Sequence, residues 1–146
     1  TAEELMAAHG GRVDSYQLDI RDPAAVQETV DEIFAAGPFT GLVNTAAGNF
    51  ISRTEALSHR GFDAISRIVM HGSFYMTHAV GKHWIDAGLR GDVLSIVTTW
   101  VRTGGPFVVP SAMSKAAVHA MTMSLASEWG RKAYGVALAA KAKKRK

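Results

Sequence analysis

The hydrophobic positions of this chain repeat at helical and strand-like spacings that alternate along the sequence. Residues 2–9 have a helical pattern that ends at a glycine pair, and residues 13–20 (VDSYQLDI) have the mixed alternation of a strand. Asp22 is predicted to cap a helix whose apolar face recurs every three to four positions through residues 24–37. A short apolar run that leads into small residues, GLVNTAAG, then predicts a buried strand and turn at 41–48.

The second half of the chain continues this alternation. Residues 54–88 predict one or two helices, broken near 58–61, and residues 92–100 (DVLSIVTTW) predict a strand rich in β-branched side chains. A helix is expected over about 111–131, and a further strand at 134–140. Strands separated by helices of this length form right-handed βαβ units, so the predicted fold class is α/β, a parallel sheet with helices on both faces. The helix before the last strand has an apolar stripe expected to pack in the core: Met113, Ala116, Ala117, Ala120, Met121, Leu125 and Trp129.

Polar and small residues follow the predicted strands. In parallel sheets, ligands bind beyond the carboxyl ends of the strands. That rule selects Asp19, the turn from Asn44 to Gly48, and the segment 98–105 as the working edge of the sheet.

The composition is that of an ordinary globular protein and narrows the functional classes. Hydrophobic residues make up 47% and charged residues 20% of the 146 positions. Because there is no cysteine, disulfides and thiolate metal sites are excluded; no metal site is predicted, and a reducing, cytoplasmic location is expected. No apolar run approaches the roughly 20 residues that a membrane span requires, so no membrane association is expected.

Positive charge is concentrated at the carboxyl end. Of the 16 basic residues five lie in residues 141–146, which leaves 11 against 13 acidic residues in the rest of the chain. A basic tail can attract nucleic acid, but no basic or aromatic stripe in the body extends such a surface. We therefore predict one domain over residues 1–140 and a disordered, solvated tail, and nucleic-acid binding is not expected.

Five short motifs carry a family resemblance: LDIRD (18–22), LVNTAAGNF (42–50), LSIVTTW (94–100), PSAMSKAA (110–117) and LASEWG (125–130). Over about residues 1–138 the sequence resembles the short-chain dehydrogenase/reductases, in particular the 2,4-dienoyl-CoA reductase branch with its Ser-x-x-x-Lys pair. The resemblance implies an incomplete Rossmann-like, doubly wound parallel sheet. It also implies an oxidoreductase that uses NADPH, with NADH left open, to reduce an enoyl- or dienoyl-CoA thioester.

The resemblance assigns roles to individual residues. Lys115 would hold the nicotinamide ribose hydroxyls, and Ser111, one helical turn earlier, would hold substrate or cofactor through its hydroxyl. The remaining cofactor contacts implied are Asp19, at the adenine amine, and Asn44, Ala46 and Gly48, beneath the strand end. Without the family, Ser111 is a reasonable helix N-cap and Lys115 a solvated lysine, so the pair alone is a weak signal.

The sequence departs from the reductase pattern at three other positions. Trp100 stands where the pattern has a tyrosine that engages the thioester carbonyl; an indole N–H can donate a hydrogen bond but does not titrate near neutral pH. Thr99 is its hydroxyl neighbour and a secondary catalytic candidate. His71 stands where the pattern has asparagine and could donate or shuttle a proton, although packing against the helix of a neighbouring subunit is the alternative. Thr45 replaces the second asparagine of the turn.

The family's glycine-rich TGxxxGxG turn, which binds the pyrophosphate, has no counterpart in the 146 residues. The resemblance therefore implies a chain truncated at both ends, in which strand 13–20 pairs directly with strand 41–48 or exposed edges associate with other chains. We expect a homo-oligomer, and little reductase activity from this chain alone. The alternative function is a non-catalytic interaction or scaffold protein that keeps the fold but cannot bind a dinucleotide.

Overall fold

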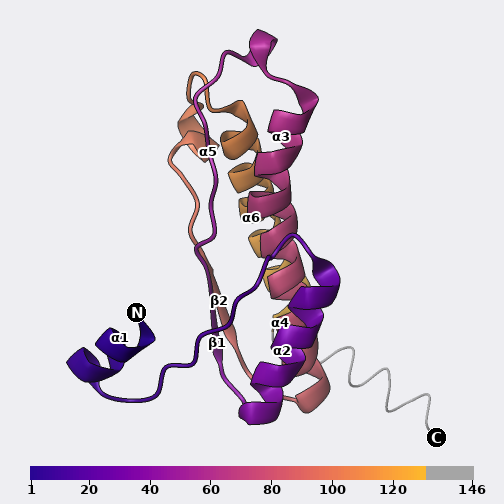
Figure 1. Cartoon of the computed structure of the whole chain (residues 1–146). Coiled ribbons are helices and arrows are strands. Elements are labelled where there is room, and N and C mark those ends of the chain that lie inside the picture. The colour runs from indigo at the N-terminus through magenta and orange to yellow at the C-terminus, as the bar shows by residue number, and fades with distance from the viewer. Residues whose placement is uncertain (131–146) are drawn as a thin grey trace, which may run out of the picture.

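The structure, a computed structural model, describes residues 1–130 and shows a stack of helices alongside a short sheet (Figure 1). The predicted strand at 134–140 and the predicted tail at 141–146 lie outside the described residues. In chain order the elements are α1 (Ala2–His9), α2 (Pro23–Ala36), β1 (Gly41–Asn44), the 3₁₀-helix η1 (Thr54–Ala56), α3 (His59–Ser66), the π-helix η2 (Arg67–Gly72), α4 (Ser73–Ala87), β2 (Asp92–Ser95), α5 (Trp100–Thr103) and α6 (Val109–Trp129).

Two parallel strands form the sheet of the described residues. β1 pairs with β2 in a register that places Asn44 opposite Ser95, which confirms the α/β class and the parallel pairing. The side chains of Leu42 and Asn44 are buried beneath the helices. Val43 and Leu94 point the other way and are 55% and 58% exposed, so helices cover one face of this sheet within residues 1–130.

Residues 13–20 do not form the predicted strand. The segment is irregular, and within residues 1–130 no ladder pairs it with β1. Leu18 and Ile20 nevertheless pack against the core, and a Cβ added to Gly72 would come within 2.5 Å of the Ile20 side chain. Both side chains are partly buried, although the segment is not a strand. A strand, however, also needs a neighbouring strand to satisfy its backbone groups, and β2 is the only ladder partner of β1 among the described residues.

The helix after Asp22 confirms the prediction. The Asp22 carboxylate accepts hydrogen bonds from the backbone N–H groups of Ala24 and Ala25, at 2.9 and 3.2 Å, so it satisfies donors that have no partner inside the helix. Val26 and Val30 are fully buried, as their spacing predicted. They form the core between α2, α4 and β1 with Leu42, Ala79, Val80 and Trp84.

A histidine–carboxylate contact ties α2 to α4. His83 Nε2 lies 2.5 Å from Asp31 Oδ1, the Gln27 side-chain amide donates to the same oxygen at 2.7 Å, and the Phe34 ring stacks on His83 with centroids 4.4 Å apart. The hydrogen bond from His83, and secondarily that from Gln27, lowers the pKa of the Asp31 carboxyl.

The Asp31 contact should make stability sensitive to acid. A carboxyl with a lowered pKa in the folded state stabilises the fold fully above its unfolded pKa, 3.8, and loses this contribution as the pH falls through the lower folded value. Asp31→Asn should therefore lower the urea midpoint at neutral pH, and the difference from the unmodified chain should shrink in acid. A difference that stays constant with pH would contradict this account.

α3, η2 and α4 follow one another without interruption as a single helical run (Figure 1). The Ser58 hydroxyl caps its start by accepting from the backbone N–H of Gly61 at 3.1 Å, which confirms the predicted break near 58–61. The middle of the run, η2, is π-helical, a conformation that is rare and occurs often at functional sites. His71 lies in this turn.

α6 differs from its prediction in start and in buried face. The helix begins at Val109 with Pro110 in its first turn, so Ser111 is an interior residue and not the N-cap. Met113, expected in the core, is 54% exposed. The buried residues are Pro110, Ser111, Ser114, Lys115 and Val118. Small side chains allow close approach on this face, and the Ser114 hydroxyl donates to the carbonyl of Pro110 at 2.7 Å, which satisfies it inside its own helix.

Candidate functional site

Lys115 is a buried cation at the carboxyl end of β2. Its side chain is carried by α6, and the residue is only 6% exposed. Its ammonium group donates to the backbone carbonyl of Ile96, the residue that follows β2. Burial lowers the pKa of the Lys115 amine. Ser111, one turn earlier on the same face, is also buried, so the Ser-x-x-x-Lys pair does not form a solvated first turn.

Asn44 ends β1 and is held on both sides. Its side-chain amide donates to the hydroxyls of Thr77 on α4, at 2.9 Å, and of Ser95 on β2, at 3.3 Å. Its backbone carbonyl accepts from the N–H of Ile96 at 3.0 Å. Lys115 binds the carbonyl of that same Ile96, so the predicted residues Asn44 and Lys115 meet at a single residue where the parallel strands end.

The rest of the predicted turn continues from this point. Ala46 and Gly48 are half-buried. A Cβ added to Gly48 would lie 3.4 Å from the Ile65 side chain, an ordinary contact, so the turn runs against α3 without requiring glycine for space.

Asp19 is placed apart from this cluster. It is exposed and pairs with Arg21, whose Nη2 lies 2.6 Å from Asp19 Oδ2. The side-chain and backbone hydrogen bonds from Arg21 lower the pKa of the Asp19 carboxyl to about 2. No hydrogen bond joins Asp19 to Asn44 or Lys115 within the part of the chain that the structure describes.

His71 and Thr99 are also outside the cluster. His71 is exposed, its Nδ1 lies 3.5 Å from the Tyr75 hydroxyl, and it borders an apolar groove between η2 and α6. Thr99 is exposed and precedes α5, where its carbonyl accepts from the Thr103 hydroxyl at 3.2 Å. Trp100 is half-buried, and a Cβ added to Gly105 would come within 2.8 Å of its ring. The strand predicted over 92–100 is shorter in the structure, because β2 ends at Ser95. A loop and the short helix α5 follow it.

Two residues of the cluster, Thr77 and Ser95, were not predicted. Thr77 is 1% exposed and lies three and seven residues before the buried Val80 and Trp84, so it occupies the apolar face of α4. A hydroxyl at an apolar position of a helical repeat must find a buried partner, and that signal was available in the sequence. Ser95 gave no comparable signal, because it sits in a strand whose two faces are both lined by apolar neighbours.

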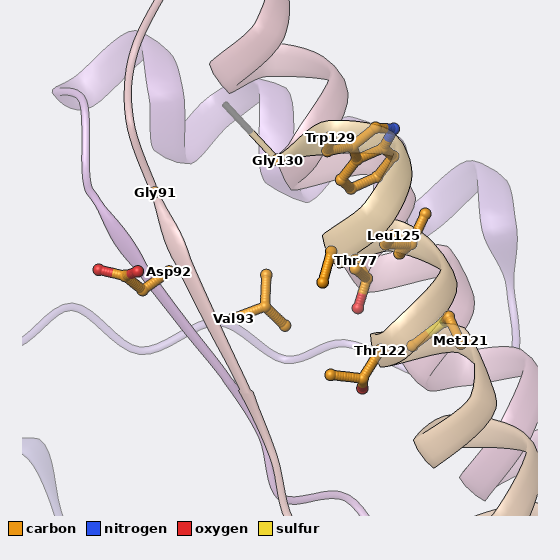
Figure 2. Close-up of a pocket in the computed structure, with 10 residues that line it drawn as sticks. Thr77, Gly91, Asp92, Val93, Met121, Thr122, Leu125, Trp129 and Gly130 are labelled. Carbon is orange, nitrogen blue, oxygen red and sulfur yellow. The ribbon is translucent and has the colours of Figure 1, made fainter. Parts of the chain in front are cut away.

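A cavity that Thr77 also lines lies toward the other end of β2. Its volume is about 320 Å³, and Figure 2 shows Val93 on the strand pointing toward residues from the second half of α6, whereas the Asp92 side chain points away from them. The α6 residues that line it include Met121, Thr122, Leu125 and Trp129. Asp92 begins β2, so the cavity reaches the amino end of the strand, opposite to the end where parallel sheets bind ligands. We therefore do not assign the cavity to the candidate site.

No group of three or more His, Cys, Asp or Glu side chains in residues 1–130 lies close enough together to hold a metal ion. Of the helices in this range, none has the length and hydropathy that crossing a bilayer would demand.

Parallel strands alternating with helices are consistent with an incomplete Rossmann-like α/β fold. Solved structures agree. A short chain dehydrogenase from Bacillus anthracis is 40% identical, with a TM-score of 0.82 over 92% of this chain and 57% of that one. A gluconate 5-dehydrogenase from Burkholderia cenocepacia in complex with NADP and tartrate is 27% identical, with a TM-score of 0.83 over 89% of this chain and 51% of that one.

Sequence comparison gives the family. The profile described as short chain dehydrogenase matches residues 1–141, so the chain belongs to this family. The probable 2,4-dienoyl-CoA reductase 3 of Caenorhabditis elegans is 45% identical over 93% of this chain and 44% of the relative. The probable 2,4-dienoyl-CoA reductase of Bacillus subtilis is 39% identical over 86% of this chain and 50% of the relative. The chain thus spans half or less of the length of these two curated relatives.

Proposed function

We propose that this chain supplies the nicotinamide side of an NADPH site in an oxidoreductase that reduces an enoyl- or dienoyl-CoA thioester. The observation that carries the proposal is the meeting of Asn44 and Lys115 at Ile96, beyond the carboxyl ends of two parallel strands. The names of the relatives support the acyl-CoA substrate class, and a related structure contains NADP.

The chemistry of Lys115 suits a ribose diol. An ammonium has three donors, and one of them is used by the Ile96 carbonyl. Because this partner is neutral, the positive charge of Lys115 is not cancelled and remains available to a ligand. The nearby Ser111 hydroxyl adds a neutral donor or acceptor on the same helix face. NADPH, when bound, supplies the hydride; Lys115 would hold and orient its ribose and stabilise negative charge nearby.

Asn44 would line the cofactor without offering its side-chain amide. Both amide hydrogens of its side chain are directed at hydroxyls inside the protein, so the amide N–H groups are not offered to a ligand. What Asn44 would contribute is the fixed shape of the 44–48 turn, against which a nicotinamide ribose would lie.

The residues of this chain fit the pyrophosphate of NADPH less well than they fit its nicotinamide ribose. The sequence contains no glycine-rich strand–turn–helix, and Trp100 replaces the tyrosine of the reductase pattern. These two observations favour the alternative, a non-catalytic interaction or scaffold protein. The two functions differ in NADPH binding: the oxidoreductase binds the cofactor, and the scaffold does not.

The finer parts of the proposal concern cofactor choice, assembly and location. We propose NADPH over NADH, with both to be compared in the binding experiment. We also propose a homo-oligomer, supported by large apolar side chains on the outer faces of α4 and α6, among which Phe74, Met113 and Met123 are 46–57% exposed. A cytoplasmic location is proposed from the absence of cysteine; relatives named as peroxisomal reductases make the peroxisome the competing compartment.

The proposal predicts weak but saturable binding of NADPH. With a nicotinamide side and no glycine-rich turn, we expect a dissociation constant of about 1 mM, near the weak end of specific binding. Titration followed by NADPH fluorescence measures it, with NADH in a parallel titration. Absence of any saturable response would favour the scaffold, and submicromolar binding would contradict the weak pyrophosphate side.

A further inference from the structure

We propose that Thr77 and Ser95 are positioning residues that set the place of the Lys115 ammonium by acting through Asn44. The inference rests on the function proposed above, in which Lys115 holds the cofactor. It assigns a role in that site to two hydroxyl side chains that would not themselves touch the cofactor.

The first part of the argument is the way Asn44 is held. Thr77 on α4 and Ser95 on β2 each accept one hydrogen bond from the Asn44 amide, at 2.9 and 3.3 Å. Asn44 is 7% and Thr77 1% exposed, so water has little access to replace either bond. Both amide hydrogens are thereby used, and three elements, α4, β1 and β2, are joined at one side chain.

The second part is the link from Asn44 to Lys115. The Asn44 carbonyl accepts from the Ile96 N–H at 3.0 Å, immediately after the last paired residues of the two strands. The carbonyl of Ile96 accepts the Lys115 ammonium. Ile96 lies just beyond the last paired residues of the two strands, so its bond to Asn44 ties it to the end of β1 and fixes where the Lys115 acceptor lies.

The third part is that burial makes the arrangement sensitive to a single hydroxyl. A buried amide hydrogen without an acceptor is unfavourable, so removing the Thr77 hydroxyl should turn the Asn44 amide toward another acceptor. The end of β1 would shift with the amide. The Ile96 carbonyl would then no longer be placed to accept the hydrogen bond from the Lys115 ammonium.

The test compares three variants of the full chain. Thr77→Val removes the hydroxyl and keeps the shape, and Thr77→Ser keeps the hydroxyl and removes a methyl group. Thr122→Val is the matched control, because Thr122 borders the same cavity as Thr77 while its hydroxyl donates within its own helix to Val118, at 2.9 Å (Figure 2). The direct measurement is the NMR scalar coupling across the hydrogen bond between Lys115 Nζ and the Ile96 carbonyl carbon.

We expect the coupling in the unmodified chain, in Thr77→Ser and in Thr122→Val, and its loss in Thr77→Val. NADPH binding should weaken about tenfold in Thr77→Val alone, the effect of misplacing one charge-assisted hydrogen bond. If Thr77→Val does not fold, Ser95→Ala removes the other acceptor and should also abolish the coupling.

The outcomes separate the two proposals. A coupling that persists in Thr77→Val, or that is lost equally in Thr77→Ser, would overturn the positioning role, since the hydroxyl would then not be what matters. A coupling that is absent from the unmodified chain would overturn it as well. If the coupling responds as expected but the unmodified chain does not bind NADPH, the positioning of Lys115 stands and the proposed function fails.

Discussion

Replacing Lys115 by methionine is expected to abolish the response of the chain to NADPH and to raise its stability. Methionine keeps most of the aliphatic stem and removes the charge. Because burial lowers the pKa of Lys115, its charged form is less favourable in the folded than in the unfolded state. The cost is fully present below the folded pKa and disappears as the pH rises above the unfolded value of 10.5. The gain in urea midpoint should therefore be largest at neutral pH and should shrink in alkali.

The matched control for this change is Lys82→Met, on the exposed side of α4. It removes the same charge from the chain without touching the candidate site, so it should change neither NADPH binding nor stability by much. A Lys115→Met chain that binds NADPH as well as the control would remove Lys115 from the cofactor site. A chain that loses both binding and stability would show that Lys115 is needed for the fold and not specifically for the ligand.

Replacing Trp84 by alanine is expected to have the largest effect on folding. Trp84 is 5% exposed, and its indole N–H donates to the Phe39 carbonyl at 2.7 Å. Its ring meets the Phe39 ring edge-on, with centroids 5.9 Å apart, and lies against Gly91, where a Cβ would come within 2.4 Å. The cavity left by alanine should lower the free energy of unfolding by about 3–5 kcal/mol, a large part of the stability of an ordinary domain.

Trp84→Phe separates packing from hydrogen bonding. It retains an aromatic ring in the core and removes the N–H donor, so the loss should be nearer 1 kcal/mol, plus a smaller packing term. Urea unfolding followed by circular dichroism measures both variants. If alanine costs no more than phenylalanine, Trp84 does not fill the core in the way the structure shows.

Local signals in the sequence predicted those parts of the fold that depend on nearby residues. The Asp22 cap, the buried pair Val26 and Val30, and the helix start at Ser58 follow from capping and periodicity, which act within one or two turns. The parallel pairing of β1 and β2 followed from the alternation of strands and helices.

The failures arose where a distant partner decides the structure. Residues 13–20 have a strand-like pattern but no ladder within the described residues. The buried face of α6 carries serines and Lys115 instead of methionines, because the helix packs its small and polar side toward Ile96 and the strand ends. Periodicity alone predicts that the apolar stripe is buried. It does not show that another element supplies a hydrogen-bond acceptor for a polar side chain such as Lys115.

The candidate site shows the same division. Asn44 and Lys115 were predicted from motifs, and the structure brings both to Ile96. Asp19, His71 and Thr99 lie outside this cluster, and their predicted roles stay predictions. Thr77 and Ser95 complete the cluster through hydrogen bonds that join positions 33 and 51 residues away from Asn44. The apolar position of Thr77 indicates that its hydroxyl has a buried partner, but one sequence does not show that this partner is Asn44.

The most direct measurement of the central claim is an NMR titration with NADPH, followed residue by residue. The account predicts that the signals that move and saturate together are those of the 44–48 turn, Ile96, Ser111 and Lys115. Signals of Thr122, Leu125 and Trp129, which line the cavity toward the amino end of β2, should stay in place. Saturable shifts confined to that cavity, or the absence of shifts at the Asn44–Lys115 cluster, would contradict the claim that this cluster binds the cofactor.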